Sequence, residues 1–72
     1  MEEKRWGKRI KGFRKLKGMT QIQLAHKMGV SVSVLGELER GSRLPDGPVL
    51  DKIAHQLNVT LEELMSKKEN DV

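Results

Sequence analysis

Residues 20–41 read Thr-Gln-Ile-Gln-Leu-Ala-His-Lys-Met-Gly-Val-Ser-Val-Ser-Val-Leu-Gly-Glu-Leu-Glu-Arg-Gly, and this stretch specifies the fold. Thr20 followed three residues later by Gln23 is a capping box. In it the threonine hydroxyl accepts a hydrogen bond from a free N–H of the first helical turn, and the glutamine side chain bonds back to the cap. Ser31 stands in the same position before a second apolar stretch. The pattern therefore predicts two short helices.

Glycines mark the ends of both predicted helices. Gly29 and Gly41 stand just past them, where a residue in the left-handed conformation ends a helix most easily. Only residues 29–31 remain as a linker. A linker this short favours a steep crossing over an antiparallel hairpin, so the segment is predicted to be a helix-turn-helix.

The rest of the chain also indicates helices and shows no strand pattern. A helix over residues 5–17 has Trp6, Ile10 and Phe13 in one apolar row, and Gly18 follows it. Asp46 caps a helix that ends near Asn58, and Thr60 begins a short helix that ends at about residue 66. The prediction is an all-α, compact five-helix domain over residues 1–66, with a charged, frayed tail over residues 67–72.

Composition excludes several classes of protein. The 72 residues include no cysteine, so disulfides and thiolate metal sites are absent. No apolar run is long enough to span a membrane, and a cytoplasmic protein is the default expectation. His26 and His55 stand on different predicted helices without further metal ligands. We see no pairing of a nucleophile with a base and no phosphate-binding loop, so we expect neither an enzyme nor a cofactor, metal or small-molecule ligand.

The positive charge is concentrated in the first part of the chain. Residues 1–43 hold 11 Lys/Arg against 4 Asp/Glu, a net +7, whereas residues 44–72 hold 3 against 6, a net −3. Eight of the basic residues crowd the first predicted helix and the residues beside it: Lys4, Arg5, Lys8, Arg9, Lys11, Arg14, Lys15 and Lys17. A solvated helix face is one interpretation. Beside a helix-turn-helix, contact with a polyanion is the other.

Short motifs spread over residues 6–65 share a further pattern. They are Arg-Ile-Lys at 9–11, Arg14, Gly18, Thr-Gln at 20–21, Leu-Ala at 24–25, Gly-Val-Ser at 29–31, Leu-Glu-Arg-Gly at 38–41, Pro45 and Leu-Asn-Val-Thr-Leu-Glu-Glu-Leu at 57–64. In these motifs the chain resembles the Cro/repressor-type, or Xre, family of bacterial and phage transcription regulators. The resemblance implies a compact five-helix domain whose third helix enters the major groove of double-stranded DNA, often as a dimer on a two-fold operator.

Several residues are expected to be structural. Gly29 ends the first helix of the motif, and Ala25 must be small because two helices approach closely there. Leu35 and Leu38 are expected to face the core. Arg14 and Glu39 match a family pair that links the first helix to the third as a partly buried salt bridge. The alternative for Glu39 is a solvated surface acid.

The expected DNA contacts form two groups. Gln21 resembles a family position that clamps a phosphate, and the other phosphate candidates are Arg9, Lys11, Arg40 and Arg43. By residue-level analogy with the family, the candidates for base contact are Val32, Ser33, Gly36 and Glu37. None of these four is Arg, Lys, Gln or Asn, so direct base recognition is expected to be modest. Gly36 costs helix stability, which either a close approach to DNA repays or weak selection tolerates.

Two functions remain open at this point. The first is a sequence-specific DNA-binding regulator, a small stand-alone repressor that is bound to the nucleoid when active. We expect it to be a homodimer, with Leu61 and Met65 as the candidate contact. The alternative is a protein-interaction module of the same fold, a partner of a toxin or of another regulator, with weak or no base recognition.

Overall fold

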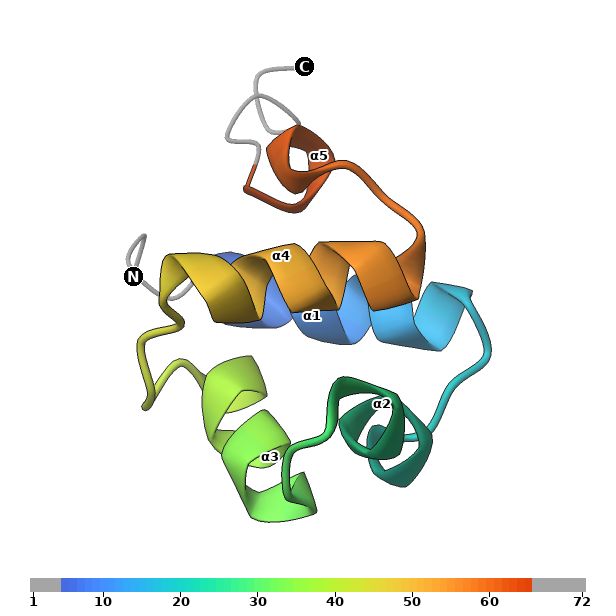
Figure 1. Cartoon of the computed structure of the whole chain (residues 1–72), viewed down its shortest axis with the longest axis vertical. Coiled ribbons are helices and arrows are strands. Elements are labelled where there is room, and N and C mark those ends of the chain that lie inside the picture. Colours follow the sequence, from blue (N-terminus) through green and yellow to red (C-terminus); the bar gives the residue numbers. More distant parts are fainter. Residues whose placement is uncertain (1–4, 66–72) are drawn as a thin grey trace.

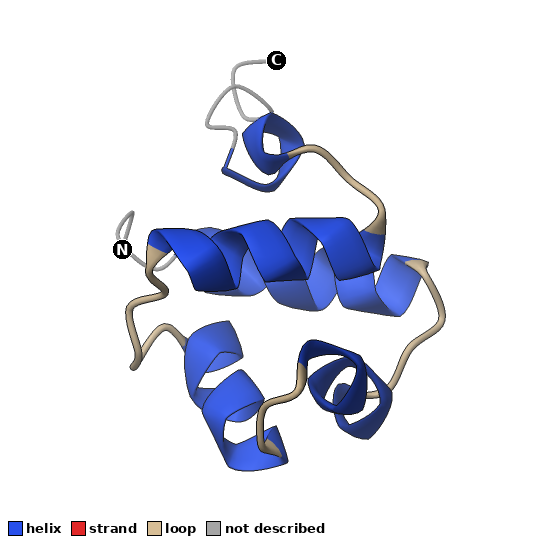
Figure 2. Ribbon diagram, in the orientation of Figure 1, coloured by secondary structure: helices blue, strands red, loops and turns tan. Residues whose placement is uncertain are grey.

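The structure is a computed structural model that describes residues 5–65, and all the regular structure in that range is helical (Figures 1 and 2). The helices are α1 (Arg5–Leu16), α2 (Gln21–Met28), α3 (Val32–Arg40), α4 (Gly47–Leu57) and α5 (Leu61–Met65). The predicted all-α, five-helix architecture is confirmed. The tail predicted over residues 67–72 lies outside the described residues.

The helices form a middle layer with a helix or a helix pair on each side. In the view of Figure 1, α4 lies in front of α1 and nearly along it, α2 and α3 lie on one side of this pair, and α5 lies on the other. α1 packs against α3, α4 and α5, so it is the central element of the domain. The helix-turn-helix and the last helix are therefore at opposite ends of the molecule.

The predicted caps are present and set the helix boundaries. Thr20 Oγ1 accepts from the Gln23 backbone N–H at 3.0 Å, and the Gln23 side chain accepts from the Thr20 N–H at 2.8 Å, which completes the capping box. Ser31 and Asp46 cap α3 and α4 through the side chain alone, accepting from the backbone N–H of Val34 at 3.1 Å and of Val49 at 2.9 Å. Gly29 ends α2 with φ 74°, in the left-handed region.

All five helices contribute to one apolar core. Its fully or nearly fully buried members are Ile10, Leu24, Ala25, Met28, Leu35, Leu38, Ile53, Ala54, Leu57 and Leu64. The structure therefore confirms that Ala25, Leu35 and Leu38 face inward. Trp6 and Phe13 pack against the edge of this core.

The helices α1 and α3 approach each other closely at Gly7 in α1. A Cβ atom added there would lie 2.5 Å from the Glu39 carbonyl oxygen and 2.7 Å from that of Leu38. Only glycine allows α1 to lie this close to the backbone at the end of α3. The sequence reasoning named Ala25 as the site of close packing and missed Gly7.

None of the helices between residues 5 and 65 combines the length and the apolar character that crossing a membrane would need.

Candidate nucleic-acid interface

A buried ion pair holds α3 against α1. Arg14 Nε donates to Glu39 Oε2 at 2.6 Å and Arg14 Nη2 donates to Glu39 Oε1 at 3.1 Å, so the contact is bidentate. The exposed fraction is 7% for Arg14 and 6% for Glu39. Arg14 Nη1 also donates to the Met19 carbonyl at 2.9 Å, in the turn before α2. This pair agrees with the family expectation and rules out a solvated Glu39.

Gln21 extends this network to the first residue of α2. Its side-chain Nε2 donates to Glu39 Oε1 at 2.9 Å. One carboxylate therefore joins α1, the start of α2 and the end of α3. The side chain that we expected to clamp a phosphate already has one amide hydrogen engaged, so the free donors at this point are its second amide hydrogen and the unpaired N–H groups of the first helical turn.

One stripe of α3 faces outward. Ser33, Gly36, Glu37 and Arg40 are spaced i, i+3, i+4 and i+7, so they share a face of the helix. Leu35, Leu38 and Glu39 occupy the opposite, buried face, and Gly36 within the outward stripe is buried as well. Val32, at the first position of the helix, is 40% exposed beside the stripe. We call Ser33, Gly36, Glu37 and Arg40 the α3 stripe.

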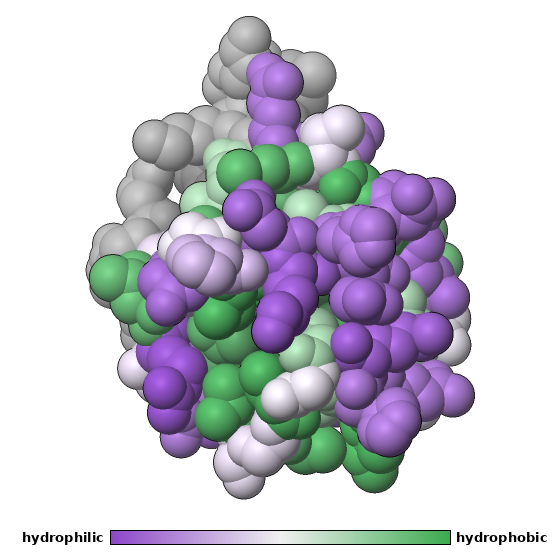
Figure 3. All heavy atoms as spheres, in the orientation of Figure 1, coloured by the Kyte–Doolittle hydropathy of each residue, from purple (hydrophilic) through white to green (hydrophobic). Residues whose placement is uncertain are grey.

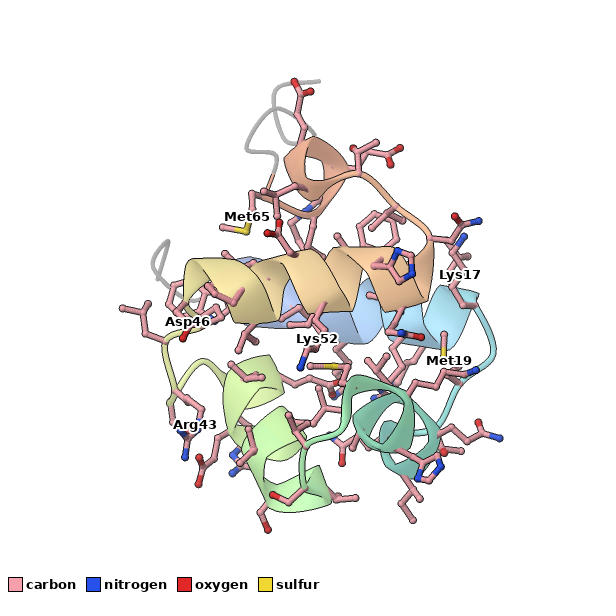
Figure 4. All side chains as sticks on the ribbon, viewed as in Figure 1. Lys17, Met19, Arg43, Asp46, Lys52 and Met65 are labelled. Atoms are coloured by element: carbon pink, nitrogen blue, oxygen red, sulfur yellow. The ribbon has the colours of Figure 1, made fainter. Side chains whose placement is uncertain are left out.

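Glu37 in the α3 stripe is paired with an arginine of the following loop. Arg43 Nε donates to Glu37 Oε1 at 2.7 Å, and both side chains are substantially exposed. Figure 4 shows Arg43 beside α3, on the outer side of the helix-turn-helix. The pair offsets the negative charge that Glu37 would otherwise present to DNA.

Gly36 is covered by the side chain of Arg40. A Cβ atom added at Gly36 would lie 3.1 Å from Arg40 Nη1 and 3.9 Å from Arg40 Cζ. The glycine, for which we left two explanations open, thus leaves room for a guanidinium folded back along the outer face of α3.

Two of the other predicted phosphate contacts, Lys11 and Arg9, lie in different surroundings on α1. Lys11 is exposed on α1 between Gly7 and Arg14, the two positions that meet α3, so it flanks the helix-turn-helix. Lys8 and Lys15 are also exposed, one turn away in either direction. These lysines place positive charge beside α3.

Arg9 is a correction to the expected set. Its Nε donates to the carbonyl oxygens of Leu64 at 2.8 Å and Glu63 at 3.1 Å, and its Nη2 donates to Glu63 as well. The guanidinium also lies 5.4 Å from the centre of the Phe13 ring. Arg9 thus binds the last turn of α5, whose carbonyl groups have no partners within the helix. It faces away from α3, so we remove it from the phosphate contacts.

The surface between α3 and α4 is mainly apolar, although Arg43 and Asp46 also line it. Figure 3 shows apolar atoms in the middle of this face with hydrophilic atoms on both sides. A small cavity there has a volume of about 120 Å³, and its lining includes Val30, Val34, Leu38, Leu44 and Val49. Ordinary ligand pockets measure roughly 300–1,000 Å³, and we propose no small-molecule ligand for this one. Within residues 5–65, no three His, Cys, Asp or Glu side chains gather in a way that could hold a metal ion.

Sequence reasoning missed two features of this region. Gly7 carried a signal, because a glycine within a helical pattern costs stability and calls for a reason. The contact of Arg9 with α5 carried none, since helical spacing does not say which neighbouring helix will meet a given face.

The geometry defines a class of protein: a helix-turn-helix domain whose third helix has an outward, partly basic face. The buried face of that helix is held by an ion pair with α1. Comparison with known proteins agrees. The helix-turn-helix family model matches residues 10–64. The HTH-type transcriptional regulator YazB of Bacillus subtilis is 52% identical over 64 residues, which cover 89% of this chain and 93% of that protein.

Two further relatives extend the comparison. The chain is 38% identical to the regulator SinR of Bacillus subtilis over 63 residues, which are 86% of this chain and 57% of SinR. The crystal structure of the restriction-modification controller protein C.AhdI of Aeromonas hydrophila superposes with a TM-score of 0.83 at 32% identity, covering 88% of this chain and 96% of that one. The chain thus spans nearly all of YazB and little more than half of SinR.

The chain belongs to the Xre-type helix-turn-helix family of transcriptional regulators. It is a regulator that binds double-stranded DNA and not an enzyme. The alternative of a protein-interaction module is not favoured by these relatives.

Proposed function

We propose that this regulator is a sequence-specific repressor that places α3 in the major groove of its operator. The observation that carries the proposal is the α3 stripe. It is an outward helix face, held by the buried Arg14–Glu39 pair and not used in packing the core. A recognition helix needs such a rigid support because base contacts depend on its orientation in the groove.

The contacts to the DNA backbone are proposed from position and charge. Lys11 is exposed on α1, which precedes the helix-turn-helix, and Arg43 is exposed in the loop that follows it. The N–H groups at the start of α2, near Gln21, add a helix terminus that favours a phosphate. These contacts position the domain without distinguishing sequences.

Base contacts are proposed for Val32, Ser33 and Glu37. Val32 can pack on a thymine methyl group, Ser33 can bond to several bases, and Glu37 can accept from a cytosine amino group. In the free protein the Glu37 carboxylate accepts a hydrogen bond from Arg43. In the complex the same carboxylate has to accept from both the arginine and the cytosine amino group.

We propose a homodimer formed through α5. Leu61 and Met65 are 43% and 37% exposed there, although the neighbouring Leu64 is fully buried. Figure 4 shows Met65 beside α5, on the other side of the α1–α4 layer from Arg43. A two-fold axis at α5 leaves both copies of α3 free, as half-sites about 34 Å apart require. Such a repressor acts on the chromosome, so we place it in the cytoplasm, bound to the nucleoid.

An electrophoretic binding titration tests the proposal. The chain is titrated against a duplex recovered by selection from a random pool and against a shuffled duplex of the same length, at several salt concentrations. We expect the selected duplex to bind about 1,000-fold or more tightly than the shuffled one, with affinity falling as salt rises. Equal affinity for both duplexes, or no binding at low salt, would refute sequence-specific repression.

A further inference from the structure

Arg40 lies on the recognition surface and not at its edge. It follows Ser33 by seven residues, almost two full turns, so both side chains leave the helix in nearly the same direction. When α3 lies in the major groove, this direction points to the floor of the groove, where the base edges are. The phosphates lie along its two walls.

The side chain of Arg40 runs back toward the start of α3. Side chains of a helix lean toward its N-terminus, and Arg40 Nη1 lies 3.1 Å from the position that a Cβ of Gly36 would take. Because Gly36 precedes Arg40 by four residues, this carries the guanidinium about 6 Å along the helix axis. The charge thus lies beside the middle of the helix, one turn closer than the Arg40 backbone to the N-terminal residues that contact bases in helix-turn-helix proteins.

The guanidinium of Arg40 is also unengaged. Within the described residues no hydrogen bond or ion pair involves it, whereas Arg43 is bonded to Glu37, Arg14 to Glu39 and Arg9 to α5. All of its N–H donors are available to a ligand. Arg40 therefore differs from Arg9, Arg14 and Arg43, whose guanidinium groups already donate hydrogen bonds within the described residues 5–65.

We propose that Arg40 is a base-reading residue and that Gly36 positions it. An arginine can bond with two donors to O6 and N7 of guanine in the major groove, a pair of acceptors that distinguishes guanine from the other bases. The inference rests on the proposed function and deepens it by assigning a guanine to each half-site. It also replaces the expectation that Arg40 contacts a phosphate.

The test is selection from a random duplex pool with the full chain and with the variants Arg40→Lys, Arg40→Ala and Gly36→Ala. Lysine keeps the charge but lacks the planar fork of arginine, so Arg40→Lys separates base contact from phosphate contact. Alanine at Gly36 keeps the helix but places a methyl group 3.1 Å from Arg40 Nη1, which is tighter than an ordinary contact, so the guanidinium has to shift. Arg9→Lys is the matched control, because it makes the same change on α1 at an arginine that binds α5 and not on the α3 stripe. Circular dichroism checks that each variant is folded.

We expect the wild-type chain to select one guanine per half-site. Its preference for guanine over other bases at that position should fall about 5- to 150-fold in Arg40→Lys and Arg40→Ala, fall in Gly36→Ala, and survive in Arg9→Lys. A wild-type site without such a guanine, or an Arg40→Lys variant with the full preference, would overturn the role of Arg40. An unchanged preference in Gly36→Ala would overturn the role of Gly36. No selection by the wild-type chain would refute the proposed function itself.

Discussion

Gly7 and Gly12 lie in the same helix and have opposite surroundings. A Cβ at Gly7 would press on two backbone carbonyl oxygens of α3, whereas nothing lies within 4 Å of a Cβ at Gly12. Carbonyl oxygens in a helix cannot move aside as the end of a side chain can. The same residue type therefore allows two helices to approach at one position and only weakens the helix at the other.

We predict that Gly7→Ala destabilises the protein by about 1–3 kcal/mol, because α1 and α3 must move apart. Gly12→Ala is the control and should stabilise it by up to about 1 kcal/mol through better helix propensity. Urea unfolding followed by circular dichroism measures both. If the two variants gained stability equally, the close approach at Gly7 would be wrong.

The two Glu–Arg pairs of α3 also differ in burial. We predict that Glu39→Ala costs about 3–5 kcal/mol, because it leaves the buried Arg14 charge without its partner. Glu37→Ala breaks the exposed pair with Arg43 and should cost less than about 1 kcal/mol.

The double variant Arg14→Met with Glu39→Leu provides the control for burial. It removes both charges and should regain much of the stability lost in Glu39→Ala, since apolar residues of similar size can replace a buried pair. Urea unfolding measures all three variants. A loss in Glu39→Ala no greater than in Glu37→Ala would show that the Arg14–Glu39 pair does not brace α3.

At this scale the sequence predicted residue types better than their contacts. The structural roles of Leu35, Leu38 and Ala25 followed from helical spacing. The Arg14–Glu39 pair came from the family resemblance, because the spacing of 25 residues indicates no contact by itself. The position of Arg40 over Gly36 required the side-chain direction as well as the helix face.

The helix boundaries were largely predictable because they are local. Thr20, Ser31 and Asp46 cap the helices in which the sequence placed them. Asn58 ends α4 in the left-handed conformation, with φ 59°. Each of these bonds joins residues three to five positions apart. How α5 meets α1 depends on the whole core, and this is the reason that the contact of Arg9 was not foreseen.

Arg9 and Arg43 should therefore have separable effects. We predict that Arg9→Ala destabilises the protein by about 1–2 kcal/mol, because it removes hydrogen bonds from a charged group to the last carbonyls of α5. It should leave the salt dependence of DNA binding unchanged. Arg43→Ala should change stability little. It should lower the slope of log affinity against log salt concentration by about one, the value for one lost phosphate contact. Unfolding curves and salt titrations of both variants check this, and a reduced slope in Arg9→Ala would restore Arg9 to the phosphate contacts.

For the whole molecule, the two ends of the domain have different proposed tasks. We predict that Leu61→Glu yields a monomer, because a carboxylate replaces an exposed apolar contact of α5 and is favourable at the start of a helix. Binding to a duplex with two half-sites should weaken about 100-fold or more through the loss of avidity.

Leu44→Glu is the matched control. Leu44 is 77% exposed but lies in the loop before α4, away from α5. Sedimentation equilibrium measures the oligomeric state of both variants. A Leu61→Glu protein that stays dimeric would move the interface elsewhere.

The distribution of charge over the whole chain fits the same division of tasks. The net charge is positive in residues 1–43, which contain α1 and the helix-turn-helix, and negative in residues 44–72. A field of this kind orients the α3 end toward a polyanion before contact. The sequence alone predicted this asymmetry of charge, while the proposed position of the DNA interface on α3 also depends on the fold.

The location of the DNA interface can be measured by nuclear magnetic resonance on the 72-residue chain. The backbone amide resonances are followed while a selected duplex is added. We predict the largest shifts at the start of α2 and over residues 32–43, with small shifts in α5. Largest shifts in α4 or α5, with α3 unaffected, would contradict the assignment of α3 as the recognition helix.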